Sequence, residues 1–200
     1  MSKFDFVEIG TSYFHTEVEN ASDETVGLSV EPVKYYLDKL PSKPKCKKAN
    51  VAISDKEGSM DLFYVPDEYI SEYDLGWWVA GTSTLLKPNK ITYEYLAKKK
   101  LAHLMTKKPV KVITFGMLAD KYNVSEINYL KVDVEGHDAV VIQSMLDYCD
   151  VHNSVFPKCI RFEANGLGDK KKEDEVICKL QNREYKIRQY RKGDYVLDRN

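Results

Sequence analysis

The stretch Leu130-Lys131-Val132-Asp133-Val134-Glu135-Gly136-His137-Asp138 decides how the chain folds. The apolar run from Tyr129 to Val134 predicts a buried strand, and Gly136 predicts the turn that follows it. Asp138 is a residue type that caps helices. An apolar helical stripe comes directly after it, formed by Ala139, Ile142, Leu146 and Cys149. The stretch therefore predicts a strand, a tight turn and a helix, the repeating unit of a parallel α/β sheet.

Further apolar runs on both sides of this unit extend the pattern. The predicted strands are Phe4–Ile9, Val26–Val30, Asn50–Ser54, Met60–Val65, Val110–Ile113 and Cys159–Ala164. The predicted helices are Val33–Leu40, Ile91–Met105, Phe115–Tyr122 and Glu173–Gln181. A hairpin closes the chain, formed by Tyr185–Tyr190, a turn at Lys192-Gly193-Asp194, and Tyr195–Asp198. This order predicts an α/β fold with a mostly parallel central sheet, a C-terminal antiparallel hairpin and helices on both faces.

The segment Pro66–Asn89 interrupts this order. It shows neither the helical nor the strand period, and it contains the tryptophan pair Trp77-Trp78. Because a loop of this length inside a compact domain is usually a binding loop, we predict a lid or an acceptor-binding wall. The chain shows no repeat and no linker, which predicts a single domain over residues 1–200. We expect this domain to be either a minimal catalytic unit or one domain of a longer polypeptide.

Charge and composition exclude several classes of protein. The 30 basic and 31 acidic side chains give a net charge of −1, whereas a nucleic-acid-binding protein usually has a basic excess. A hydrophobic fraction of 43% is that of a globular chain rather than a disordered one. The four cysteines form no C-x-x-C pair, and the sequence has neither a signal-peptide pattern nor an apolar run long enough to span a membrane. We therefore expect reduced thiols, no zinc site and a cytoplasmic protein.

Polar residues at the ends of the first two strands predict a nucleoside site, because ligands of open α/β sheets bind outside the carboxyl ends of the strands. Gly10 permits a close turn there, and Thr11 and Ser12 can present N–H groups and hydroxyls to a ligand. Glu31, about 20 residues beyond this turn, is placed to accept hydrogen bonds from both ribose hydroxyls. The alternative is an exposed glutamate that caps a helix, with Pro32 at the first helical position.

The first loop favours an adenosine without bulky phosphates. It lacks the G-x-G-x-x-G pattern that binds a pyrophosphate, so S-adenosylmethionine is favoured over NAD. In such a site the end of the third strand approaches the adenine. We expect Pro32, Ile53 and Ser54 to lie beside the cofactor.

Two later strand ends carry carboxylates close together. Side chains alternate along a strand, so Asp133 and Glu135 can point the same way, as can Glu163 and Asn165. A buried carboxylate needs a donor or a cation, and the sulfonium and amino group of S-adenosylmethionine are cations. The alternative is a structural cluster of helix caps and salt bridges. No dedicated metal-binding cage is predicted.

Six segments make the chain similar to the FkbM family of methyltransferases over nearly its whole length. They are FVEIGTS (6–12), LSVEPVKYYLDKL (28–40), NVAISDKEGSMDLFYV (50–65), GTSTLL (81–86), VKVITFGMLADKY (110–122) and INYLKVDVEGHDAVVIQ (127–143). The last contains a K-[IV]-D-[IV]-E-G core followed by a helix, which is the most specific mark of the family. The resemblance implies a class I methyltransferase fold, S-adenosylmethionine as the methyl donor, and O-methylation, often of a sugar.

The resemblance also implies a set of cofactor residues. Those that match the family by position are Glu8, Gly10, Glu31, Asp133 and Glu135. The chain departs from the family in the first loop, where Glu8-Ile9-Gly10-Thr11-Ser12 stands in place of D-x-G-A-N-x-G. It departs again at His137-Asp138, where the family commonly has a small residue and then an acidic one. We therefore expect a cofactor cradle that differs in detail.

Methyl transfer from a sulfonium is an in-line displacement, in which the protein places the acceptor oxygen and removes its proton. The candidate bases are Asp133, His137 and Glu163, in that order. The residues expected to contact the acceptor are Trp77, Trp78, Ser83 and Asn165. Both tryptophans can instead anchor the loop in the core. Sugar O-methylation is the leading hypothesis, with methylation of a protein or small metabolite, or a non-catalytic cofactor- or glycan-binding domain, as the alternatives.

Overall fold

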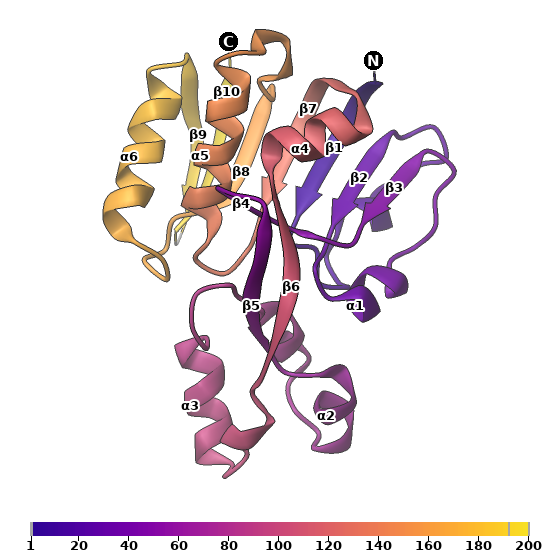
Figure 1. Ribbon diagram of the computed structural model, residues 1–200, viewed down its shortest axis with the longest axis vertical. Coiled ribbons are helices and arrows are strands. Elements are labelled where there is room, and N and C mark those ends of the chain that lie inside the picture. Colours follow the sequence, from indigo (N-terminus) through magenta and orange to yellow (C-terminus); the bar gives the residue numbers. More distant parts are fainter. Residues whose placement is uncertain (1, 192, 200) are drawn as a thin grey trace.

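The computed structural model describes residues 2–191 and 193–199, and its centre is a seven-stranded sheet (Figure 1). The strands lie in the order β3 (Cys46–Ala49), β2 (Gly27–Val30), β1 (Ser2–Ile9), β7 (Val124–Val132), β8 (Cys159–Glu163), β10 (Asp194–Arg199) and β9 (Tyr185–Arg191). The first five are parallel, and β10 runs antiparallel to both β8 and β9. The predicted parallel sheet with a C-terminal hairpin is confirmed. Lys192, in the predicted turn, lies outside the described residues.

The strand, turn and helix predicted around Asp133 are present. β7 ends at Val132, and α5 (Asp138–Cys149) begins after the turn at Gly136. Gly136 has a φ of +93°, a left-handed conformation that glycine adopts without steric cost. The Asp138 carboxylate accepts hydrogen bonds from the N–H groups of Gly136 (3.2 Å) and Glu163 (3.3 Å). One short motif therefore fixes the ends of two neighbouring strands.

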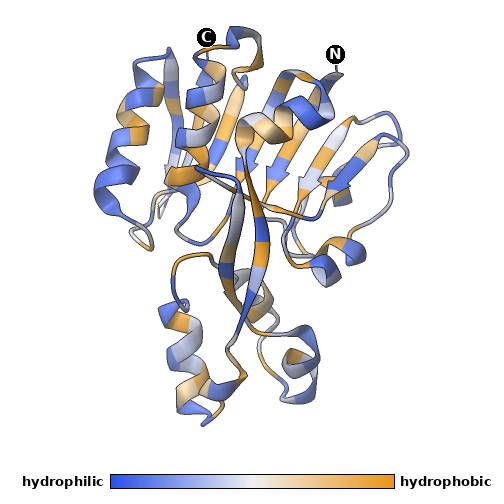
Figure 2. Cartoon of the chain, viewed as in Figure 1, coloured by the Kyte–Doolittle hydropathy of each residue, from blue (hydrophilic) through white to orange (hydrophobic). Residues whose placement is uncertain are grey.

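Three helices cover one face of the sheet. α4 (Phe115–Tyr122), α5 and α6 (Lys170–Gln181) pack side by side across it (Figure 1). Leu130 and Ile160 on the strands share one buried core with Ile142 of α5. Figure 2 shows hydrophobic stretches on these strands and a largely hydrophilic α6, as expected for a helix with one side in solvent.

The opposite face is covered over β1 and β2. Phe6 alternates with Val7 along β1, so its side chain points away from the main core. It packs with Val18 of the 3-10 helix η1 (Glu17–Asn20) and with Leu37 of α1 (Lys34–Lys39). The predicted helices on both faces are therefore confirmed.

A second sheet of three strands lies beside the first. β4 (Ala52–Ser54) pairs parallel with β6 (Thr106–Thr114), and β6 pairs antiparallel with β5 (Gly58–Tyr64). The prediction that Asn50–Ser54 forms the third strand of the central sheet is wrong. β3 takes that place, and it is an edge strand, where lysines such as Lys47 and Lys48 are commonly found.

The segment between β5 and β6 folds into a lobe beyond the carboxyl ends of the parallel strands (Figure 1). Its elements are α2 (Asp67–Glu72), the 3-10 helix η2 (Trp77–Thr82), α3 (Lys90–Lys98) and the 3-10 helix η3 (Ala102–Leu104). Its buried residues Val79 and Leu96 share one apolar core with Leu62 of β5, Val112 of β6 and Tyr36 of α1. The lobe lies over the edge of the sheet where ligands of such folds bind.

Two element predictions in this region are corrected. The segment Pro66–Asn89 is not irregular throughout, because it contains α2 and η2, and these are too short to show a helical period. The predicted helix Ile91–Met105 ends at Lys98, and the chain turns at Lys100, which has a left-handed φ of +62°.

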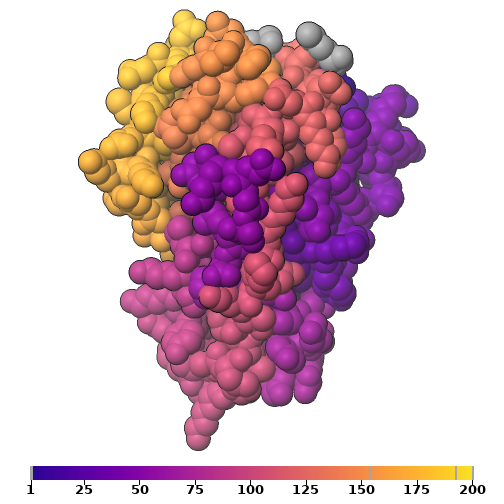
Figure 3. All heavy atoms as spheres, in the orientation of Figure 1, coloured from indigo at the N-terminus to yellow at the C-terminus, as the bar shows by residue number. Residues whose placement is uncertain are grey.

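Figure 3 shows how closely the parts pack on one face. The segment that joins β3 to β5 fills the surface between the helices of the central sheet and the lobe. The four cysteines are free. Within the described residues, no helix combines the length and the apolar character needed to cross a membrane.

The ends of β1 and β7 meet at Gly10. The N–H of Asp133 donates to the carbonyl of Ile9 (2.9 Å), and the N–H of Gly10 donates to the carbonyl of Val30 (2.9 Å). Gly10 has a φ of +82°, and a Cβ atom there would lie 1.9 Å from the Asp133 carbonyl oxygen. Only glycine fits this approach of the two strands.

We expect Gly10→Ala to lower the free energy of unfolding by about 2–4 kcal/mol, because the left-handed backbone alone costs alanine about 1–2 kcal/mol and the clash with Asp133 adds to it. Urea and thermal unfolding measure the loss. Gly166 provides a matched control, since it has a φ of +81° and a Cβ atom there would meet nothing within 4 Å. Equal losses in Gly10→Ala and Gly166→Ala would contradict the close approach.

Candidate functional site

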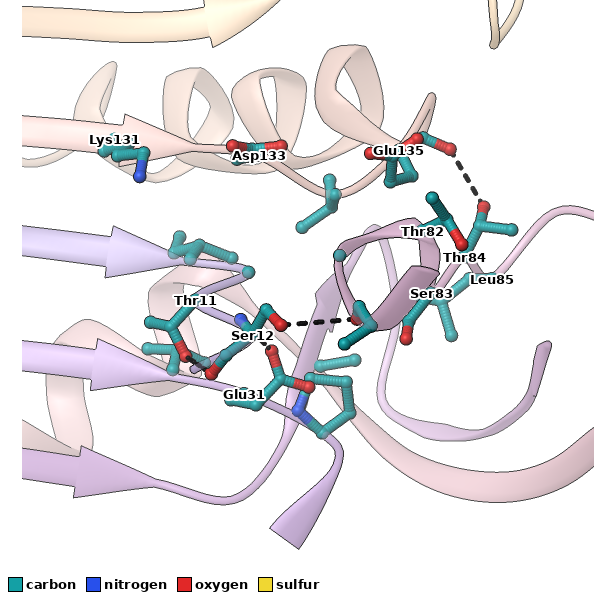
Figure 4. Close-up of a pocket in the computed structure, with 18 of the residues that line it drawn as sticks. Thr11, Ser12, Glu31, Thr82, Ser83, Thr84, Leu85, Lys131, Asp133 and Glu135 are labelled. Atoms are coloured by element: carbon teal, nitrogen blue, oxygen red, sulfur yellow. Dashed lines mark hydrogen bonds between the residues drawn. The ribbon is translucent and has the colours of Figure 1, made fainter. Parts of the chain in front are cut away.

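A cavity of about 570 Å³ lies between the carboxyl ends of the central strands and the lobe. This volume is within the range of ligand pockets, about 300–1,000 Å³. In Figure 4 the ends of β1, β2 and β7 approach the η2 segment of the lobe across it. The predicted site residues that line the cavity are Gly10, Thr11, Ser12, Glu31, Pro32, Ile53, Trp77, Trp78, Ser83, Asp133, Glu135 and Glu163.

Glu31 places a buried carboxylate at the β2 side of the cavity. Its two oxygens accept hydrogen bonds from the N–H groups of Ser12 (2.9 Å) and Val33 (2.8 Å). Each oxygen keeps a second lone pair, so the carboxylate can also accept from hydroxyls of a ligand. Burial raises the pKa of Glu31 to about 7, against the opposing effect of these hydrogen bonds. The alternative of an exposed helix cap fails, because Glu31 is 3% exposed.

The backbone around the cavity is strained at three positions. Ser12, His15 and Glu135 have left-handed φ values of +48°, +55° and +53°. Such conformations cost non-glycine residues about 1–3 kcal/mol each and concentrate at functional sites. Ser12 is held by its hydroxyl, which donates to the carbonyl of Ala80 in η2 (3.2 Å). This bond ties the loop after β1 to the lobe.

Three carboxylates gather at the ends of β7 and β8. Asp133, Glu135 and Glu163 line the cavity, and burial raises the pKa of each. Mutual repulsion acts in the same direction, so the pKa of Glu135 reaches about 8 and that of Glu163 about 7. Lys131 and Arg161 oppose the shift at Asp133. Such a cluster favours a ligand with positive charge, because a cation stabilises the ionised carboxylates.

The acidic cluster offers no assembled metal site. Within residues 2–191 and 193–199, no group of three or more His, Cys, Asp or Glu side chains is arranged to hold a metal ion. The arrangement instead leaves the carboxylates directed at the cavity as hydrogen-bond acceptors.

Glu135 connects this cluster to the lobe. Its carboxylate accepts a hydrogen bond from the Asn89 side-chain amide (2.9 Å), and its carbonyl accepts one from the Thr84 hydroxyl (2.9 Å; Figure 4). Asn89 also caps α3, because its side-chain oxygen accepts from the N–H groups of Ile91 and Thr92. The start of α3 is therefore fixed to the end of β7.

A buried ion pair lies one row deeper in the sheet. The Lys131 ammonium donates to the Glu8 carboxylate (2.8 Å) and to the carbonyl of His15 (3.3 Å). The second oxygen of Glu8 accepts from the N–H of Glu17 (2.9 Å). Lys131 lines the cavity, whereas Glu8, predicted as a cofactor residue, does not. Glu8 instead holds the strained loop in place, because burial of its carboxylate requires a cation and donors.

Aromatic rings border the lobe side of the cavity. Trp77 is 57% exposed, and its ring meets those of Phe14 and His15 edge-on, with centroids 4.9 and 5.6 Å away. Trp78 packs against Tyr95 in the lobe core, with 5.2 Å between the ring centroids. The two tryptophans therefore differ. Trp78 packs in the lobe as a loop anchor would, whereas the ring of Trp77 stays accessible to a ligand.

Besides Glu8, three predicted residues, Ser54, His137 and Asn165, do not line the cavity. His137 is buried with its Nε2 atom 3.0 Å from the hydroxyl of Ser54, and burial lowers the pKa of His137 to about 4. Ser54 lies beside His137 rather than at the cavity because its strand, β4, belongs to the second sheet. Asn165 is exposed, and its amide donates to the Glu163 carboxylate (2.7 Å). His137 and Ser54 thus join α5 to β4, while Asn165 orients a residue of the cavity.

Several cavity residues escaped the sequence reasoning. They are Phe14, His15, Thr82, Thr84, Lys131 and Arg161. Lys131 and Arg161 stand two residues before Asp133 and Glu163 at the ends of β7 and β8, so side-chain alternation was a signal for both. His15 and Thr84 carried no such signal, because their places depend on how the lobe folds over the sheet.

Comparison with known proteins identifies the family and supports the fold of the chain. The profile described as "Methyltransferase FkbM domain" matches residues 7–187. No curated protein matches the chain. The chain is similar to the crystal structure of methyltransferase FkbM from Methylobacillus flagellatus KT, with a TM-score of 0.51 and 8% identity over 99% of this chain and 44% of that one. At this identity the likeness shows the fold, and this chain spans less than half the length of that protein. Because the family profile covers most of its length, the chain belongs to the FkbM methyltransferase family.

Proposed function

We infer that this methyltransferase uses S-adenosylmethionine and transfers a methyl group to a hydroxyl of a sugar. The observation that carries the inference is a cavity with buried carboxylates on both sides of the Gly10 turn. Glu31 supplies a buried carboxylate beside the Gly10 turn, and Asp133 and Glu135 supply carboxylates on the other side of that turn. This matches a nucleoside with two ribose hydroxyls, joined to a group that carries two positive charges.

The lobe supports a sugar as the acceptor. Trp77 presents an accessible ring at the cavity, and an aromatic face suits the C–H side of a pyranose. Ser83 and Thr82 line the same side and can bond sugar hydroxyls. The resemblance to a family that often methylates sugars points the same way. The segment 66–89 therefore acts as the acceptor-binding wall.

Bound S-adenosylmethionine supplies an activated methyl group on its sulfonium. The protein has two tasks, to hold the acceptor oxygen in line with that methyl group and to take the hydroxyl proton. Asp133 is the first candidate for the second task, because it lines the cavity and burial raises its pKa, which makes the carboxylate a better proton acceptor. Glu163, with a pKa of about 7, is the second. His137 lies outside the lining and is no longer a candidate.

Glu31→Ala tests the cofactor assignment. We expect this change to weaken binding of S-adenosylmethionine and of its demethylated product by about 1–3 kcal/mol, the worth of charge-assisted hydrogen bonds left unmade. Titration calorimetry measures both affinities. Glu173→Ala is a matched control, because Glu173 is also buried and accepts from a backbone N–H, that of Gly166, outside the cavity. Unchanged affinity in Glu31→Ala would remove the ribose assignment.

Asp133→Asn separates a proton acceptor from a binding residue, because it keeps the shape of the side chain and removes its charge. As a base, Asp133 predicts a loss of turnover of roughly 10²–10⁴-fold with cofactor affinity nearly intact. Transfer of a labelled methyl group to a sugar acceptor, found by screening mono- and oligosaccharides, measures the turnover. Affinity that falls in step with turnover would assign Asp133 to cofactor binding, and near-normal turnover would contradict both roles.

The buried carboxyl groups also predict how stability depends on pH. The pKa is raised to about 7 for Glu31 and Glu163 and to about 8 for Glu135 and Asp138. In an unfolded chain such groups titrate near pH 4, so the native state binds more protons than the unfolded state at neutral pH. The free energy of unfolding should therefore fall as the pH rises from about 5 to about 8, between the unfolded and the native pKa values, and level off above that range.

Urea unfolding of the ligand-free protein at several pH values measures this slope. Glu135→Gln should flatten it, because the variant has one raised carboxyl fewer. Glu126→Gln is the control, since Glu126 is partly exposed beside Lys158 and Lys3, which lower its pKa. Stability that stays level or rises over this range would show that the cavity carboxylates are not destabilised by burial.

A further inference from the structure

The cavity is lined by two side chains that carry a permanent positive charge, Lys131 and Arg161. The charge of Lys131 is already paired with a carboxylate of the protein. Its ammonium bonds the fully buried Glu8 carboxylate at 2.8 Å and the His15 carbonyl at 3.3 Å. Removing Lys131 from this pair would leave Glu8 buried without a partner, so Lys131 is a structural cation.

Arg161 lies beside Lys131 but makes weaker contacts with other protein groups. The two residues are paired in the register of β7 and β8, so their side chains project from the same face of the sheet. The Arg161 side chain is 42% exposed, and its guanidinium lies 3.6 Å from the carboxylate of Asp194. Tyr129 is a second neighbour of the guanidinium. A guanidinium has five N–H donors in a planar fork, so these two neighbours leave donors for a ligand.

Carboxylates stand next to this cation. Asp133 follows Lys131 by two residues, just beyond the end of β7, and Glu163 follows Arg161 by two residues at the end of β8. Side-chain alternation therefore places both carboxylates on the same face as the two basic residues. Attraction to Asp133 and Asp194 contributes to the raised pKa of Arg161. The ends of β7 and β8 thus offer a cation and carboxylates side by side. This arrangement is complementary to an amino acid zwitterion, because the cation can bind its carboxylate and the carboxylates can bind its ammonium group.

The proposed cofactor contains such a zwitterion at the end opposite its adenine. From β2 to β8 the cavity presents Glu31, then the Gly10 turn, then Asp133, then Arg161. Along S-adenosylmethionine the corresponding order is ribose, sulfonium, and the amino and carboxylate groups. We propose that Arg161 binds the α-carboxylate of the cofactor's methionyl group. This assignment rests on the proposed use of S-adenosylmethionine.

The competing role for Arg161 is to neutralise the acidic cluster without touching the cofactor. The two roles differ in what happens when the ligand's carboxylate is removed. The probes are S-adenosylhomocysteine and its decarboxylated analogue, the adenosyl thioether of 3-aminopropanethiol, which keeps the adenosine, the sulfur and the amine. Titration calorimetry gives the affinity of each probe for the wild-type protein and for Arg161→Gln.

We expect wild-type protein to bind S-adenosylhomocysteine about 10- to 100-fold more tightly than the decarboxylated analogue, and Arg161→Gln to lose most of that preference. Its affinity for the analogue should stay nearly unchanged. Arg161→Lys should recover part of the preference, because it restores the charge without the fork. Arg188→Gln is the matched control, since Arg188 also lies on the sheet beside an aspartate, Asp198 (3.2 Å), but outside the cavity lining.

Two results would overturn the assignment while leaving the proposed function in place. One is an equal loss of affinity for both probes in Arg161→Gln, which would show a role in the acidic cluster. The other is a preference for the carboxylate that persists in Arg161→Gln with the melting temperature unchanged. Failure of wild-type protein to bind S-adenosylhomocysteine at all would remove the proposed function and this assignment together.

Discussion

The backbone of Gly10 packs against the carbonyl oxygen of Asp133, at a separation that leaves no room for a side chain. This contact brings the turn after β1 to the end of β7, and the rest of the site depends on it. Ser12, two residues further, reaches both Glu31 and the lobe from this turn. Glu135, two residues beyond Asp133, bonds the lobe from the other side. A single close approach of two strands therefore aligns the Gly10 turn, the acidic end of β7 and the lobe.

The electrostatics of the cavity follow from the same geometry. Strand ends that meet closely bring their carboxylates together, and burial then opposes ionisation of Asp133, Glu135 and Glu163. The charge of Glu8, which lies deeper in the sheet, is neutralised within the protein by Lys131. The carboxylates at the cavity, Asp133, Glu135 and Glu163, are compensated only in part, by Lys131 and Arg161. The proposed methyl donor is cationic, so on binding it would supply the missing positive charge.

The sequence predicted the parts of the fold that repeat a period. The strand at Tyr129–Val134, the turn at Gly136 and the helix after it were predicted because each has its own local signal. β3 was missed, since Cys46-Lys47-Lys48-Ala49 is an edge strand without an apolar run. The site was predicted where residues follow a strand, as at Glu31 and Asp133. His15 lines the cavity through long-range packing that no local pattern in the sequence indicates. His137 was expected in the site but contacts Ser54 instead, because β4 pairs with β6 and places Ser54 beside its ring.

A crystal structure of the protein with S-adenosylhomocysteine tests the central claim most directly, because it locates the cofactor in the cavity. We expect both ribose hydroxyls to donate to the Glu31 carboxylate and the sulfur to lie between the Gly10 turn and Asp133. The part of the cavity beside Trp77 should stay open to an acceptor. A ribose bound away from Glu31, or a ligand bound outside this cavity, would contradict the proposed function.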